Sequence, residues 1–154
     1  MSFRITGLPA AEFADLFSLD DAALRARRAV RQVVDARLSF PCRISLTDAE
    51  IGERVILVNY EHQSADTPYR ASHAIYVREG EVTYDAVDAV PDQLRRRMLS
   101  LRAFDEAGMI VGADLVDGRK LEDAIATLLA DKRAAYLHAH FAKYGCYAAR
   151  IERA

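Results

Sequence analysis

The feature that most constrains this chain is a nearly unbroken apolar run at residues 54–60, with Val55, Ile56, Leu57 and Val58 in succession. A strand exposed on one face alternates apolar and polar residues, whereas a strand covered on both faces is apolar throughout. Residues 73–78 form the next clear strand. A glycine-containing turn at residues 79–81 then predicts a β-hairpin into residues 82–84. The fold is therefore expected to centre on a sheet.

The rest of the chain supplies further strands and several helices. Alternating or β-branched segments predict strands at residues 3–6, 30–34, 40–46, 99–104 and 109–116. Helical spacing and N-terminal capping patterns predict helices at residues 9–17, 18–28, 91–97 and 120–132. We expect an α+β fold in which an antiparallel or mixed sheet of about six to eight strands carries about three or four helices mainly on one face.

The segment 134–144 allows two interpretations. It extends the preceding helix to a C-cap at Gly145, or residues 136–141 form a strand that pairs through a hairpin with residues 146–151. Propensity favours the helix at the start of the segment, whereas aromatic and β-branched residues favour the strand later on. We favour the hairpin.

Length and composition limit the class of protein. The 154 residues fit one domain, residues 1–154, and contain no apolar stretch of membrane-spanning length. The N-terminus lacks the features of a signal peptide, so a cytoplasmic location is expected. The net charge of −2 and the absence of a continuous basic patch argue against a nucleic-acid partner.

A polar segment between the two clearest strands is the best candidate site. It is expected to be a long loop, and loops held by rigid strands often carry ligand-binding groups. Arg70 offers a planar fork suited to a carboxylate or phosphate, and His73 is the candidate acid or base. The other candidate binding residues in the segment are Tyr60, Glu61, His62 and Tyr69. The alternative interpretation is a solvated connection held by its own hydrogen bonds.

Three residues outside that segment are further binding candidates. Arg43 and Arg102 are expected to assist Arg70. Cys42 precedes Arg43, whose charge would lower the thiol pKa and favour a nucleophile. For Cys42 we favour the other interpretation, a small buried apolar residue.

The sequence assigns no metal ligands and no cofactor. There is no phosphate-binding or dinucleotide-binding glycine pattern and no Cys-x-x-Cys pair. If residues 136–141 form a strand, His138 and His140 share one face, and Cys146 lies across the hairpin. This arrangement makes a zinc or iron site conceivable, but no complete ligand set follows from it.

Several segments resemble one protein family in wording and order. They are residues 40–46, 60–63, 68–75, 101–104 and 145–147. Across essentially the whole chain the sequence resembles the bacterial family called domain of unknown function 1203. The resemblance implies a compact single-domain protein and supplies no catalytic residue.

Three functions are compatible with these observations, and whether the protein is an enzyme stays open. The favoured hypothesis is binding or turnover of a small anionic metabolite at residues 60–73. The alternative is a non-enzymatic protein-interaction module, because arginine and tyrosine are enriched at interface hot spots. A metal-binding protein is the weaker alternative. Monomer and homo-oligomer are both open.

Overall fold

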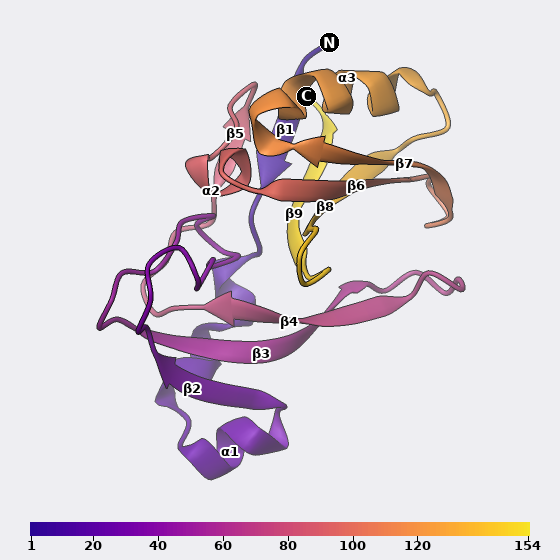
Figure 1. Cartoon of the computed structure of the whole chain (residues 1–154). Helices are drawn as coiled ribbons and strands as arrows, with labels where there is room; N and C mark the ends of the chain where they lie inside the picture. Colours follow the sequence, from indigo (N-terminus) through magenta and orange to yellow (C-terminus); the bar gives the residue numbers. More distant parts are fainter.

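The computed structural model describes residues 1–154, which form two antiparallel sheets and three α-helices (Figure 1). The strands are β1 (Phe3–Thr6), β2 (Ala29–Val33), β3 (Arg54–Gln63), β4 (Ala71–Val77), β5 (Asp85–Val87), β6 (Met98–Phe104), β7 (Ile110–Asp117), β8 (Tyr136–Phe141) and β9 (Tyr147–Arg153). The α-helices are α1 (Asp21–Ala26), α2 (Asp92–Arg95) and α3 (Leu121–Ala130), and the 3₁₀ helices are η1 (Ala10–Glu12), η2 (Ala14–Ser18) and η3 (Gly118–Lys120). None of these helices has the length and apolar character needed to cross a bilayer.

The larger sheet has the strand order β5-β1-β9-β8-β6-β7 and carries the main core. One face of β6 presents Leu99, Leu101 and Ala103, all buried, as strand alternation requires. Helix α3 covers this face with Leu121, Ile125, Leu129 and their neighbours. The opposite face of the sheet is the more polar one.

The smaller sheet has the order β2-β3-β4, and both faces are covered at the start of β3. Ile56 and Val58 join a cluster that includes Leu24 of α1, whereas Val55 packs in a separate cluster with Cys42. The apolar run is therefore a strand covered on both faces, as the sequence predicts.

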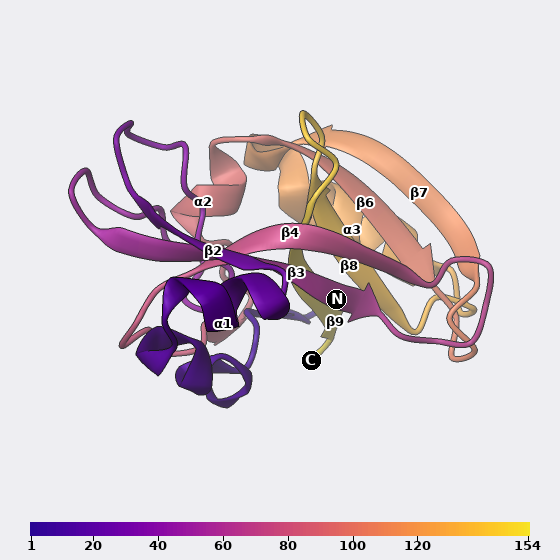
Figure 2. The same cartoon turned by 90° about the horizontal axis from the view of Figure 1, so that it is seen from below.

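The two sheets meet at the β8–β9 hairpin, which confirms the hairpin interpretation of the C-terminal segment. Figure 1 shows this hairpin pointing towards β4, and Figure 2 shows β8 and β9 crossing β3 and β4. Tyr147, at the start of β9, belongs to the core cluster of the smaller sheet. The polar face of β8 is thus turned towards the smaller sheet.

The sequence predicts a single sheet, and this part of the prediction is wrong, because the strands divide between a six-stranded and a three-stranded sheet. As a result, α1 lies beside the smaller sheet and α3 covers the larger one, so the helices do not gather on one face. The segment expected to be one helix at residues 9–17 forms the two short helices η1 and η2. Helix α1 is capped by Asp20, whose carboxylate accepts a hydrogen bond from the backbone of Ala23 at 2.8 Å.

Two expected strands do not form. Residues 40–46 make only isolated bridges, Pro41 with Asp48 and Cys42 with Tyr76. Their alternating burial arises in a turn, where Leu46 has a positive φ of 52°. Residues 82–84 do not return along β4, because the backbone of Tyr84 bonds to Gly7 and Ile44 and leads the chain into β5 beside β1.

Candidate metal centre

All four histidines of the chain converge between the two sheets, two from each. His62 lies on β3 and His73 on β4 of the smaller sheet, whereas His138 and His140 lie on β8 of the larger sheet. The ring centroids of His62 and His140 are 5.0 Å apart, and those of His73 and His140 are 5.4 Å apart. Residues separated by more than sixty positions thus form one cluster.

A β-bulge brings the first two rings together. Strands β3 and β4 pair Glu61 with Ser72 and Gln63 with Ala71, so His62 is the extra residue between them. A bulge redirects the side chain of its extra residue, and bulges are enriched beside functional sites. Here Nε2 of His62 lies 2.7 Å from Nδ1 of His73.

The period-two geometry of β8 places the other two rings on one face. Both are buried, with 3% of His138 and none of His140 exposed. Their strand faces the smaller sheet, and the pairing of β8 with β9 shifts register between Ala139 and His140.

The ring of His140 is oriented by a backbone carbonyl. Its Nδ1 lies 2.9 Å from the oxygen of Gly145, and a carbonyl only accepts, so Nδ1 carries the proton. In the neutral ring Nε2 therefore carries a free lone pair, and this nitrogen is buried without any hydrogen-bond partner. Metal-binding histidines typically donate one ring N–H to such a carbonyl and ligate through the other nitrogen.

Three of the imidazoles have the spacing of a ligand set. His62, His73 and His140 each offer a ring nitrogen, and these nitrogens all lie within 4.8 Å of one another. A tetrahedral zinc ion with bonds of about 2.0–2.1 Å holds its ligand nitrogens about 3.3 Å apart. Binding therefore requires the rings to move by about an ångström.

Buried nitrogens without partners are costly, and this cluster has three. They are Nδ1 of His62, Nδ1 of His138 and Nε2 of His140. An unsatisfied buried polar atom costs about 1–3 kcal/mol, and such atoms in a native protein call for an explanation. A bound cation would satisfy those that reach it.

The environment holds the imidazoles in their neutral form, as metal binding requires. Burial lowers the pKa of His62 to about 4 and the pKa values of His138 and His140 to about 3. Burial also lowers the pKa of His73, the most open of the four. At neutral pH each ring therefore keeps a nitrogen lone pair.

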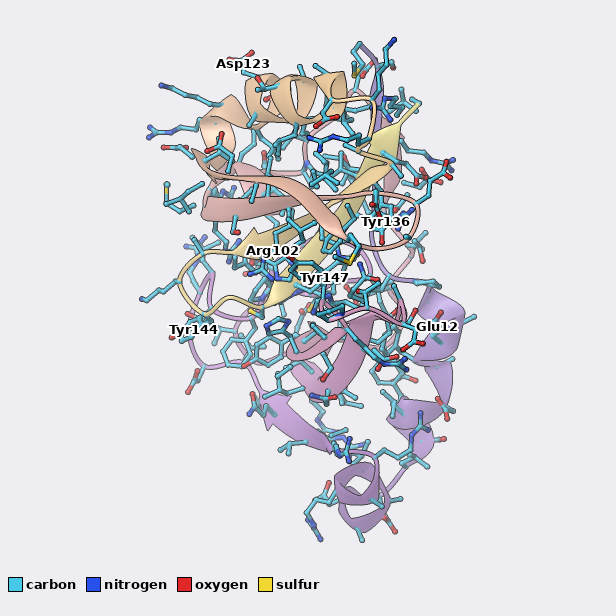
Figure 3. The ribbon with its side chains drawn as sticks, turned by 90° about the vertical axis from the view of Figure 1, so that its right-hand side faces the viewer. Glu12, Arg102, Asp123, Tyr136, Tyr144 and Tyr147 are labelled. Atoms are coloured by element: carbon cyan, nitrogen blue, oxygen red, sulfur yellow. The ribbon has the colours of Figure 1, made fainter.

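Aromatic rings pack around the cluster. The ring of Tyr147 stacks on His62 with centroids 5.0 Å apart and planes 9° from parallel. Phe104 and Tyr136 pack on His138, with centroid distances of 5.0 and 5.2 Å. Figure 3 shows Tyr136, Tyr147 and Arg102 in the middle of the molecule, at the level where the sheets meet.

Arg102 is the cation whose charge acts on all four histidines. It lies on β6 directly opposite His138 of β8, so the two side chains share a face. Its positive charge contributes to the lowered pKa of all four histidines. Its guanidinium is half-buried, makes no hydrogen bond or ion pair within the chain, and has a pKa that burial lowers. It is therefore free to bind a ligand.

Comparison with known proteins identifies the family of the chain. A family model described as "Protein of unknown function (DUF1203)" matches residues 39–153. The chain belongs to the DUF1203 family. The matched region includes the four histidines and Arg102. Neither the curated proteins nor the solved structures contain a match to the chain.

The segment 60–73 of this DUF1203 protein differs from the expected long loop. Half of it belongs to β3 and β4, and the connection between the strands is limited to residues 64–70. Arg70 lies on the surface in a two-pronged ion pair with Glu61, at 3.0 and 3.1 Å. Both side chains are partly exposed, and the guanidinium of Arg70 is engaged by Glu61 and not by the histidines.

The two candidate tyrosines pack on neighbouring rings outside the cluster. Tyr60 contacts Phe13 with centroids 5.5 Å apart, and burial raises its pKa to about 12. Tyr69 is exposed and meets the edge of Phe104 at 6.4 Å. Of the candidates predicted in this segment, His62 and His73 are the ones that the fold places in the cluster.

The remaining candidates have structural roles away from the histidines. Arg43 is fully buried and donates to the carbonyls of Tyr147 and Pro41 and to the sulfur of Cys146, 3.1 Å away. The sulfur of Cys146 therefore accepts a hydrogen bond from Arg43 and does not form a metal-ligand group with His138 and His140. Cys42 is fully buried, and burial raises the pKa of its thiol to about 12, which fits the favoured interpretation of a small buried apolar residue better than an activated nucleophile.

Sequence reasoning missed the convergence of the four rings. One signal was available, since three of the four histidines lie on predicted strands and His62 lies in the polar segment that joins two of those strands. The spatial relationship of those pairs depends on how the two sheets meet, which no local pattern encodes.

Proposed function

We propose that this protein binds one divalent transition-metal ion through the imidazoles of His62, His73 and His140. The observation that carries the proposal is the orientation of His140: the Gly145 carbonyl fixes its Nδ1 as the donor, and its buried Nε2 has no other partner. Three imidazoles from three strands, with their nitrogens within 4.8 Å, complete the ligand set.

The chemistry of the set favours particular ions. Imidazole suits zinc, copper, iron and nickel, whereas calcium and magnesium prefer oxygen ligands. No carboxylate contacts any of the four histidines, so hard cations have no ligands here. Three protein ligands leave one tetrahedral position open, which is the pattern of catalytic rather than structural zinc sites.

His138 serves as the internal reference for this proposal. It is as deeply buried as His140 and lies two residues away on the same face, yet it is outside the set of three. Its ring centroid is 6.3 Å from that of His140. If any buried histidine of the cluster could serve as a ligand, substitution of His138 would weaken metal binding as much as substitution of His140.

Equilibrium dialysis of the metal-free protein against Zn²⁺ or Co²⁺ tests the proposal. We expect one ion per chain, with affinity lowered about 100-fold or more in His140→Gln, because loss of even an outer-shell partner costs 10–100-fold. His138→Gln should retain the ion. Binding that is absent, or that is unchanged in the triple variant His62→Gln/His73→Gln/His140→Gln, would refute it, with circular dichroism verifying the fold of each variant.

A further inference from the structure

The charges around the histidine cluster are unbalanced. The three proposed ligands are neutral, so a bound divalent ion would bring its full charge into a partly buried space. Arg102 adds another positive charge on the same side. A buried charge without a counter-ion is costly, and the cost falls when an opposite charge lies within contact distance.

The nearby acidic side chains are already engaged. Glu61 receives both prongs of Arg70, and Glu152 accepts from Arg150 at 3.1 Å. The guanidinium of Arg150 also lies over the Tyr136 ring, 3.9 Å from its centroid. Arg102 differs from both of these arginines, since it has no acidic or carbonyl partner in the chain.

From this contrast we infer that Arg102 and the open coordination position of the metal together bind a small oxyanion. The inference rests on the proposed metal site and specifies its ligand. An arginine fork matches the two oxygens of a carboxylate or phosphate, and a metal ion takes an oxygen of the same group. The sequence-based expectation of a small anion is retained, and its anchor moves from Arg70 to Arg102.

The position of Arg102 suits this role better than that of any other candidate arginine. Arg43 is fully buried with its donors engaged, and Arg70 is paired on the surface. Arg102 is half-buried, so a ligand from solvent reaches it, yet it is desolvated enough for its hydrogen bonds to be strong. His73, also half-buried, is the proposed ligand on the open side of the cluster.

Anion titration of the Co²⁺-loaded protein tests the inference, because the visible spectrum of cobalt responds to a new ligand. We expect acetate or inorganic phosphate to change the spectrum saturably, while neutral acetamide does not. If acetate alone saturates the spectral change, the site prefers a carboxylate ligand. If phosphate saturates it at lower concentration, the site prefers a phosphate group. Arg102→Gln should weaken the anion about tenfold or more, as expected for the loss of charge-assisted hydrogen bonds, and should still bind Co²⁺.

Arg70→Gln is the matched control, since it removes an arginine of the same region that faces away from the cluster. It should leave the anion affinity unchanged. If Co²⁺ binds but no anion alters the spectrum, or if Arg102→Gln responds like the parent, the oxyanion inference is overturned and the metal site stands. If Co²⁺ itself fails to bind, both proposals fall.

Discussion

Nε2 of His62 lies 2.7 Å from Nδ1 of His73, across the bulge of the β3–β4 hairpin. At this distance the two rings share one hydrogen bond, in which one nitrogen donates and the other accepts. A metal ion needs a lone pair from each ligating ring, so it would replace this bond. The pair therefore links the metal-free and metal-bound forms of the site.

A double-mutant cycle on this pair measures whether both rings bind the same ion. We expect His62→Gln and His73→Gln each to weaken Zn²⁺ strongly, and the double variant to lose clearly less than the sum of the two losses. Groups that act together on one ligand are non-additive. Affinities come from competition with a coloured chelator, and strictly additive losses would argue for two independent sites.

Metal loading should stabilise the fold, because the ion joins strands from both sheets. At a free Zn²⁺ concentration about 100 times the dissociation constant, linkage adds about 2.7 kcal/mol. For a chain of this size we expect the melting temperature to rise by about 8 °C. A chelator should reverse the rise, and His140→Gln should abolish it in a scanning calorimetry experiment. An equal rise in that variant would place the ion elsewhere.

The individual strands were largely predictable, whereas the site was not. The apolar run of β3 and the alternation of Leu99, Leu101 and Ala103 in β6 follow from burial on one or both faces, which sequence encodes locally. The division into two sheets depends on which strands pair, and pairing is non-local. The bulge at His62 and the turn at Gly145 are single-residue features that set the geometry of the cluster.

The strand prediction for residues 40–46 is wrong for a related reason: local patterns do not show which backbone groups pair. Ile44 and Leu46 are buried without being in a strand, because the side chain of Arg43 holds that turn against β9. Alternation reports burial and not hydrogen bonding, so it cannot distinguish a strand from an ordered turn. Arg102 was among the candidates, but only the fold shows that it lacks a partner.

The ion pair of Arg97 with Asp48 is expected to hold the turn-rich segment 37–50 to the body of the protein. Arg97 donates to Asp48 at 2.7 Å and to the Leu38 carbonyl at 2.8 Å, and the Asp48 carboxylate is only 8% exposed. Arg97→Ala leaves that carboxylate unpaired and should cost about 2 kcal/mol in urea unfolding. Arg133→Ala, which removes an exposed pair with Asp131, should have no measurable effect. Equal losses would contradict this reading.

Cys42 should be unreactive in the folded protein. Its side chain is fully buried, and its pKa of about 12 exceeds the ordinary value of 9.0. At pH 8, below both values, the thiol stays protonated, and only the thiolate reacts. We expect a thiol reagent to label Cys146 alone at pH 8, with Cys42 labelled after denaturation, as peptide mass spectrometry will show. Equal labelling of both in the native protein would show that the segment opens readily.

Gly145 links the turn of the β8–β9 hairpin to the metal site. Its φ is +77°, and its carbonyl accepts the hydrogen bond that orients His140. Gly145→Ala strains this backbone conformation by about 1 kcal/mol and should shift the carbonyl. We expect Zn²⁺ affinity to fall about tenfold, the loss typical of a disturbed outer-shell partner.

Gly80→Ala provides the matched control, because Gly80 has a φ of +78° and, like Gly145, open space around its Cβ position. It lies in the turn after β4, away from the histidines. Both variants should lose similar stability in urea, since the backbone strain is the same. Only Gly145→Ala should lose metal affinity. If the two variants bind Zn²⁺ equally well, the carbonyl of Gly145 does not orient the ligand, and His140 must be held by packing alone.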